Sequence, residues 1–199
     1  MANGIISELK KGIYQLSEDE LETYTCEVLK AVTKDSTAKN KYYATHILNG
    51  PKYLKTWGKD CSYYNSMKEF VEPQRTILNN GGEVVRIFII PRPFLKKQVD
   101  VCKNMFDFHD RYYEDTRNKV TTLVYVPKND KQLSPDITIV NDSIVFEWHR
   151  STHAKYGYTK GYCYTSDEKD LHLQRFKSLR LQAHDLSDSN FDLSKLLSL

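Results

Sequence analysis

Long hydrophobic runs are missing from this 199-residue sequence, and so are paired cysteines. No stretch approaches the roughly 18 apolar residues that a membrane-spanning helix needs, and residues 1–9 lack the apolar core of a secretory signal peptide. These absences predict a soluble, cytoplasmic protein. The four cysteines are scattered and no pair has the C-x-x-C spacing of a zinc or redox site, so we expect reduced, mostly buried thiols.

A strong excess of charge of one sign is also missing. The 29 Lys and Arg residues and 26 Asp and Glu residues leave a net charge of only +3, which does not favour nucleic acid as a partner. Hydrophobic residues make up 40% of the chain and charged residues 28%, as in an ordinary globular protein. The length is sufficient for one domain with a substantial core.

Helical and strand patterns alternate along the chain. Ser17 and Glu20 form a capping box that predicts the start of the first helix. Pro73 is expected to break or kink the second helix at Glu72, or to open a further helix as its first residue. The expected elements are a helix from residue 17, strands at 41–48, 83–90 and 121–126, helices at 63–80 and from 95, a hairpin at 136–148, a short edge strand at 162–165 and a last helix capped by Ser166. Two strand–helix–strand crossovers imply parallel pairing, so we predict a three-layer α/β/α fold with a mixed central sheet.

The strand at 83–90 is the most apolar in the chain, with Arg86 as its one charged interior residue. A nearly continuous apolar run is typical of a strand that is buried on both faces, so we expect an interior position in the sheet. We divide the chain into an N-terminal helical segment (1–40), an α/β domain (41–184) and a polar C-terminal tail (185–199). Leu196, Leu197 and Leu199 are expected to dock the end of this tail.

Two stretches of this sequence resemble the phospholipase D-like domains of bacterial proteins. The first contains Tyr43-Ala44-Thr45-His46, Trp57 and a glycine-led strand, Gly81-Gly82-Glu83-Val84-Val85-Arg86-Ile87-Phe88. The second, Asp136-Ile137-Thr138-Ile139-Val140-Asn141-Asp142, opens the predicted hairpin. The resemblance covers residues 42–148. It implies a phospholipase D-like fold and a regulatory or defence role for a module that binds a small-molecule ligand or a protein partner.

Active members of that superfamily carry the motif H-x-K-x-x-x-x-D, in which the histidine attacks phosphorus. If Asn141 takes the place of the motif's aspartate, Asp136 stands at the lysine position and Ser134 at the histidine position. An acid cannot clamp a phosphate, and serine without a base cannot replace the nucleophile. The resemblance therefore implies a non-catalytic module, with no cofactor and no metal.

The alternative is a phosphodiesterase or nuclease with a divergent site. The one literal H-x-K, His153-Ala154-Lys155, supplies the candidate catalytic residues His153 and Lys155, but Lys160 stands where the aspartate belongs. A homodimer is compatible with the sequence, although each half-site would still lack the aspartate. His149 and His153 are four residues apart in a segment without a helical pattern, so we interpret them as loop residues and not as metal ligands.

A ligand site is expected at the carboxyl ends of the central strands, where loops from separate crossovers meet. The candidate ligand-binding residues are His46, Trp57, Arg86, Arg92 and Asp136. Arg86 has two interpretations, a structural ion pair or a contact with an anionic ligand. We expect it to pair with Asp136, because a buried arginine needs a partner.

Overall fold

The computed structural model describes residues 12–49, 68–129, 135–150, 158–188 and 192–197. Eight of the described segments join one mixed sheet in the order β1-β7-β6-β5-β2-β3-β4-β8. The strands are β1 (Ile13–Ser17), β2 (Lys41–Ile47), β3 (Glu83–Ile89), β4 (Thr121–Tyr125), β5 (Asp136–Val140), β6 (Ile144–Arg150), β7 (Tyr158–Tyr164) and β8 (His184–Asp185). The helices are α2 (Glu18–Val32), α5 (Lys68–Asn79), α6 (Arg92–Tyr112), α7 (Lys169–Gln182) and the 3-10 helix η2 (Leu193–Leu197).

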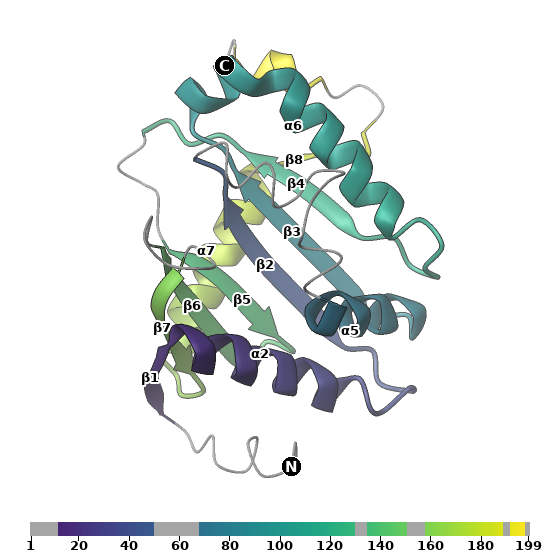
Figure 1. Ribbon diagram of the computed structural model, residues 1–199, viewed down its shortest axis with the longest axis vertical. Coiled ribbons are helices and arrows are strands. Elements are labelled where there is room, and N and C mark those ends of the chain that lie inside the picture. Colours follow the sequence, from purple (N-terminus) through teal and green to yellow (C-terminus); the bar gives the residue numbers. More distant parts are fainter. Residues whose placement is uncertain (1–11, 50–67, 130–134, 151–157, 189–191, 198–199) are drawn as a thin grey trace.

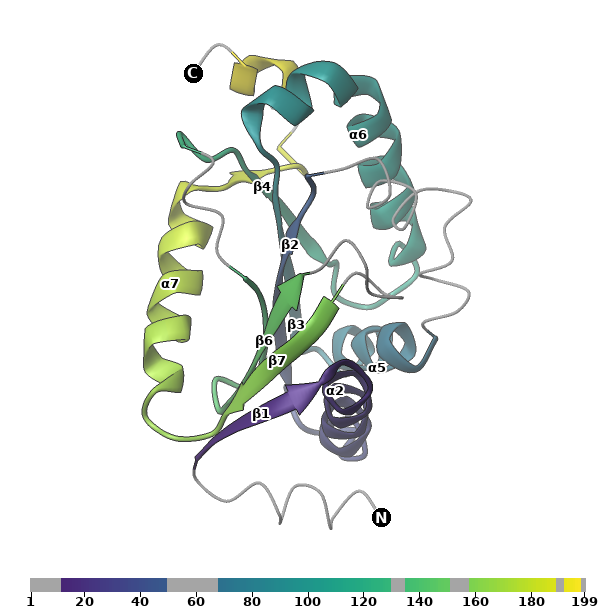
Figure 2. The ribbon, with the colours of Figure 1, turned by 60° about the vertical axis from the view of Figure 1, so that its left-hand side comes forward.

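The fold has three layers. Helices α2, α5 and α6 cover one face of the sheet and α7 covers the other (Figures 1 and 2). Strands β2, β3 and β4 are parallel, and the remaining pairs are antiparallel. The predicted α/β/α architecture with a mixed sheet is therefore confirmed.

Strand β3 lies between β2 and β4, as its apolar sequence predicted. The residues from Val84 to Ile89 are all buried. Even-numbered residues of β3 face α5 and α6, and odd-numbered residues contribute to the core beneath α7. A charged residue at an even position of this strand, such as Arg86, is therefore forced into the interior.

Two predicted helix ends are confirmed in detail. The Ser17 amide donates to Glu20 Oε2 at 2.8 Å and the Glu20 amide donates to Ser17 Oγ at 3.4 Å, which completes the capping box. After α5, Gly81 has a φ of 77°, the left-handed conformation that favours glycine. The predicted break at Pro73 is wrong, because α5 continues through it. Tertiary packing of the buried face of α5 outweighs the missing hydrogen bond.

Two further predictions about chain order need correction. Strand β7 is not at the edge, because β1 pairs with it in the register Ile13↔Tyr164. The sequence analysis missed β1, which has only five residues and a partner about 150 residues away. Ser166 does not cap the last helix: α7 begins at Lys169, Glu168 occupies the cap position, and no side chain caps it.

Both ends of the described chain join the main body. Leu21 and Leu29 of α2 are fully buried in the same core as β2 and β3. In the tail, β8 pairs with β4, and η2 packs on α6 with Leu196 buried. Docking of the tail through Leu196 is confirmed, while Leu199 lies outside the described residues. The boundaries after residues 40 and 184 stay predictions.

The cysteines that the structure describes are free and buried. Burial raises the pKa of Cys26 to about 12, that of Cys102 to about 11 and that of Cys163 to about 12. These three thiols therefore stay protonated at neutral pH and unreactive. Cys61 lies outside the described residues. No helix in the described part of the chain has the length and apolar character needed to cross a membrane.

Candidate functional site

Three of the predicted ligand-binding residues, His46, Arg86 and Asp136, project from the same face of the sheet. The register pairs Ala44 with both Arg86 and Thr138, and side chains two residues apart on a strand share a face. Helices α5 and α6 cover this face and add polar side chains of their own. We call the resulting group the buried polar cluster, which consists of His46, Gln74, Arg86, His109, Asp136 and Arg150.

Arg86 is fully buried at the centre of this cluster. One terminal nitrogen donates to His46 Nε2 at 2.7 Å, and the other donates to Gln74 Oε1 of α5. Its guanidinium also lies 5.7 Å from the centre of the Tyr42 ring. These neutral contacts hold the cation in place from two elements.

The contact with Arg86 decides the tautomer of His46. Arginine only donates hydrogen bonds, so His46 Nε2 must accept, and the proton of the neutral ring lies on Nδ1. Burial, together with the charges of Arg86 and Arg150, holds the pKa of His46 well below its ordinary value. The lone pair on Nε2, which a nucleophile or a general base would use, is therefore engaged within the protein.

His109 of α6 lies near enough to Arg86 to be affected by its charge. Its ring packs 5.5 Å from Phe88 and 5.3 Å from Tyr113, both edge-on. Burial, and then the charge of Arg86, lowers the pKa of His109 well below the ordinary value. The cluster thus keeps both histidines neutral beside a permanent cation.

Asp136, the first residue of β5, does not pair with Arg86. Its Oδ1 accepts the Ile47 amide at 2.8 Å, and its Oδ2 accepts both Nε (2.9 Å) and a terminal nitrogen of Arg150. The expected Arg86–Asp136 ion pair is therefore wrong. In the hairpin register Asp136 lies opposite Trp148, so Arg150, on the same face two residues further along β6, can reach the carboxylate. Asp136 thus ties β2, β5 and β6 together.

Arg92, the remaining predicted site residue that the structure describes, does not belong to this cluster. Arg92 opens α6 and donates to the carbonyl oxygen of Leu197 at 3.2 Å, so it contacts the C-terminal tail. Trp57, Ser134, His153 and Lys155 lie outside the described residues. Among the residues that the structure does describe, no group of three or more His, Cys, Asp or Glu side chains is placed to hold a metal ion.

Sequence reasoning missed Gln74, His109 and Arg150. His109 and Gln74 fall on the apolar faces of their helices, and a polar residue there is a usable indication of a buried polar contact. Arg150 was missed because the predicted hairpin ended at residue 148, whereas the observed strand β6 continues for two more residues, to Arg150.

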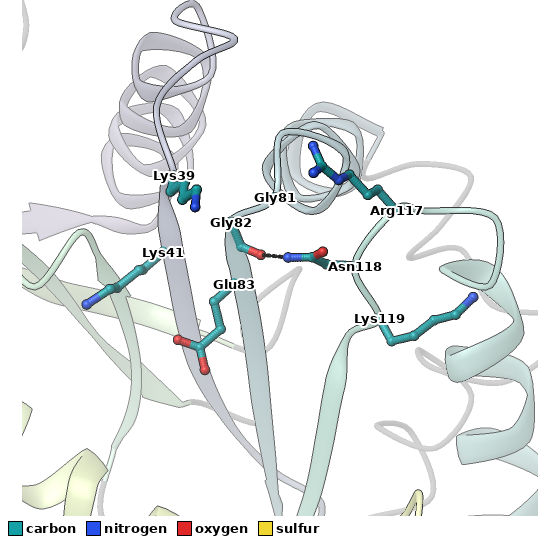
Figure 3. Close-up of a pocket in the computed structure, with 8 residues that line it drawn as sticks. All are labelled: Lys39, Lys41, Gly81, Gly82, Glu83, Arg117, Asn118 and Lys119. Carbon is teal, nitrogen blue, oxygen red and sulfur yellow. Dashed lines mark hydrogen bonds between the residues drawn. The ribbon is translucent and has the colours of Figure 1, made fainter.

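A second candidate region lies at the opposite end of the parallel strands. It is a broad pocket of ≈ 580 Å³, which we call the amino-end pocket (Figure 3). The described residues that line it are Lys39, Lys41, Gly81, Gly82, Glu83, Arg117, Asn118 and Lys119. They precede or open β2, β3 and β4, so the pocket is built from three chain segments.

Charges in the amino-end pocket are mostly positive. Four of the lining residues are Lys or Arg, and Glu83 is the one carboxylate among those described. The Glu83 carboxylate is held by Tyr43 Oη at 2.7 Å and by Arg180 at 2.8 Å. Asn118 Nδ2 donates to the Gly82 carbonyl at 2.8 Å and fixes the loop before β4 against β3. The sequence analysis did not anticipate this pocket, although basic residues precede both β2 and β4.

Comparison with known proteins finds no matching family model and no matching curated protein. Similar solved structures include the phospholipase D family member Nuc from Salmonella typhimurium, with 11% identity and a TM-score of 0.47 over 88% of this chain and 98% of that one. NucT from Helicobacter pylori has 12% identity and a TM-score of 0.48, over 89% of this chain and 99% of that one.

The archaeal chromatin protein TrmBL2, whose structure shows a novel mode of DNA binding, has 9% identity and a TM-score of 0.44. The match covers 89% of this chain but only 55% of TrmBL2, so this chain corresponds to about half of that protein. Similarity at these levels does not establish a shared activity. The two regions of this molecule must be interpreted from their own chemistry.

Proposed function

We propose that this chain is a non-catalytic binding module with a phospholipase D-like fold, and that the buried polar cluster supports its structure. The observation that carries the proposal is the hydrogen bond from Arg86 to His46 Nε2. A histidine that attacks phosphorus needs a free lone pair on the attacking nitrogen, and this lone pair is engaged.

The environment of Asp136 supports the same conclusion. Both carboxylate oxygens accept hydrogen bonds from the protein, and the side chain is 2% exposed. A carboxylate held in this way acts as a strut between strands β2, β5 and β6. These contacts within the protein favour a module without turnover. Through the sequence resemblance alone, the proposal extends to a regulatory or defence role.

A turnover assay tests this proposal. The full chain is incubated with bis(p-nitrophenyl) phosphate and with DNA, without metal and with Mg²⁺, Mn²⁺, Ca²⁺ or Zn²⁺. We expect no product above a buffer control under any of these conditions. The His46→Gln and His153→Ala variants are assayed in parallel, and turnover that either substitution abolishes would overturn the proposal in favour of the divergent phosphodiesterase.

A further inference from the structure

We propose that the amino-end pocket binds a small ligand that carries two or more linked phosphate groups. This inference rests on the proposed function, that the chain binds a ligand and does not turn it over. It places the ligand at the opposite end of the parallel strands from the buried polar cluster.

The concentration of charge is the first argument. Four cations and one carboxylate line the pocket, an excess of three positive charges, which equals the net charge of +3 of the whole chain. Lys39, Lys41, Arg117 and Lys119 are all exposed to solvent. Lys41 also pairs with Asp142, and Lys119 donates to the Glu114 carbonyl oxygen. Such a concentration attracts anions before contact.

The shape of the pocket explains why a ligand can approach the backbone. Gly81 carries no side chain, and Lys41 and Lys119 lie on opposite sides of it in Figure 3, whereas the space beside Gly82 is filled by Asn40 and Ile77. A Cβ added at Gly81 would lie 3.8 Å from a terminal nitrogen of Arg117, so the space above Gly81 is the space beside that guanidinium. A phosphate there can be bonded by the fork of Arg117.

The lining also limits the class of ligand. Among the described residues it contains no aromatic or aliphatic side chain, so nothing in it would stack on a nucleobase or pack against an apolar group. The cations come from the starts of β2 and β4, which are two strand spacings apart, about 10 Å at the backbone. A single phosphate cannot contact both sides equally well, whereas linked phosphates can.

Acidic residues restrict the length of the ligand. On the β2 side, Asp142 Oδ2 lies 3.0 Å from Lys41 Nζ. On the β4 side, Glu114 and Asp115 precede Arg117, and Asp115 pairs with Arg75. A long polyanion would run over these carboxylates, so the bounded basic region fits a small ligand better than a nucleic-acid strand.

Isothermal titration with sodium tripolyphosphate at low salt tests the inference, with pyrophosphate and orthophosphate as shorter probes. We expect affinity to fall in the order tripolyphosphate, pyrophosphate, orthophosphate. Lys39→Ala and Arg117→Ala should each weaken tripolyphosphate binding about tenfold, the effect of losing one charge-assisted hydrogen bond. The matched controls Lys97→Ala and Arg111→Ala remove exposed cations of α6 that do not line the pocket, and should leave binding unchanged.

Three results would overturn the inference. The first is no binding of tripolyphosphate, or binding that the pocket and control substitutions affect equally. The second is equal affinity for orthophosphate and tripolyphosphate. The third is tighter binding of a single-stranded oligonucleotide than of tripolyphosphate, which would assign the pocket to nucleic acid. Turnover of bis(p-nitrophenyl) phosphate is measured on the same samples. Turnover would overturn the proposed function, whereas the titration tests ligand binding by the pocket independently.

Discussion

The two ends of the parallel strands hold similar residue types under opposite conditions. At the carboxyl end, Arg86 and Arg150 are buried or nearly so and are bonded to protein groups. At the amino end, Lys39 and Arg117 are exposed and line a pocket. A buried charge that loses its partner strongly destabilises the fold, whereas exposed charges contribute little to stability and remain accessible to ligands. The comparison separates the residues that hold the fold from those that we propose bind a ligand.

The largest expected effect comes from breaking the ion pair at the carboxyl end. Asp136→Ala leaves Arg150, with its side chain 14% exposed, without its carboxylate and removes the acceptor of the Ile47 amide. We expect a loss of about 3–5 kcal/mol in the free energy of unfolding, measured by urea denaturation. The control is Asp142→Asn, which breaks the exposed pair with Lys41, keeps a residue type that tolerates the φ of 55° at this position, and should cost at most about 1 kcal/mol. Equal effects of the two substitutions would remove the distinction between the two regions.

Acid should weaken the carboxyl-end cluster. His46 and His109 have a lowered pKa in the folded state, so below the ordinary pKa of about 6.5 the unfolded chain binds more protons than the folded chain. Stability is then fully present above about pH 6.5 and falls by about 1.4 kcal/mol per pH unit for each histidine as the pH drops below it.

Urea unfolding at pH 7.5, 6.5 and 5.5 measures this slope. His172, whose pKa is also lowered by burial, adds to it in the same direction. His109→Gln should reduce the slope by about 1.4 kcal/mol per pH unit. A stability that does not change between pH 7.5 and 5.5 would mean that the histidines are not held neutral by the fold.

Substitutions at Gly81 and Gly82, which form the floor of the amino-end pocket, should cost more stability than substitutions at Lys39 and Arg117, the exposed cations at its rim. A Cβ added at Gly82 would lie 2.2 Å from the Asn40 carbonyl oxygen and 2.7 Å from Ile77 Cγ2, so Gly82→Ala should destabilise the fold by about 1–3 kcal/mol or more. Gly81→Ala meets no close atom, but its φ of 77° should cost about 1–2 kcal/mol. Thermal unfolding of both variants measures which substitution costs more stability. A Gly82→Ala variant that is more stable than the Gly81→Ala variant would contradict the expectation.

The smallest effect on stability is expected at the rim of the pocket. Lys39→Ala and Arg117→Ala remove exposed side chains, so the free energy of unfolding should change by no more than about 0.5 kcal/mol. Urea denaturation is the measurement. A loss of about 2 kcal/mol or more in the free energy of unfolding of either variant is about four times the expected limit. It would show that these exposed cations stabilise the fold as the buried ion pair of Asp136 is expected to do.

Local sequence patterns were sufficient for the architecture but not for the partners of its charged groups. The crossovers that make β2, β3 and β4 parallel follow from alternating helical and strand patterns, and the interior place of β3 follows from its apolar run. Strand β1 has no such pattern, since its pairing with β7 depends on a contact about 150 residues away.

The candidate site shows the same limit. Strand positions placed His46, Arg86 and Asp136 near the carboxyl ends of the central strands, and the structure puts their side chains on one face of the sheet. Their role in binding a ligand stays a prediction. Their partners were not predictable, because Gln74 and His109 come from helices whose rotation against the sheet is decided by packing. The amino-end pocket needs three loops that are distant in sequence to meet, and no local motif records that meeting.

One measurement tests the central claim most directly, that the buried polar cluster is structural and the amino-end pocket binds the ligand. Tripolyphosphate is titrated into ¹⁵N-labelled full-length protein, and the shifts of the backbone amides are followed by NMR. The account predicts that the amides of Gly81, Gly82, Asn118 and Lys119 shift on saturation, while those of Ile47, Arg86 and Ile137 do not. Shifts concentrated at Ile47, Arg86 and Ile137 would contradict it, because they would place the ligand at the carboxyl ends of the strands.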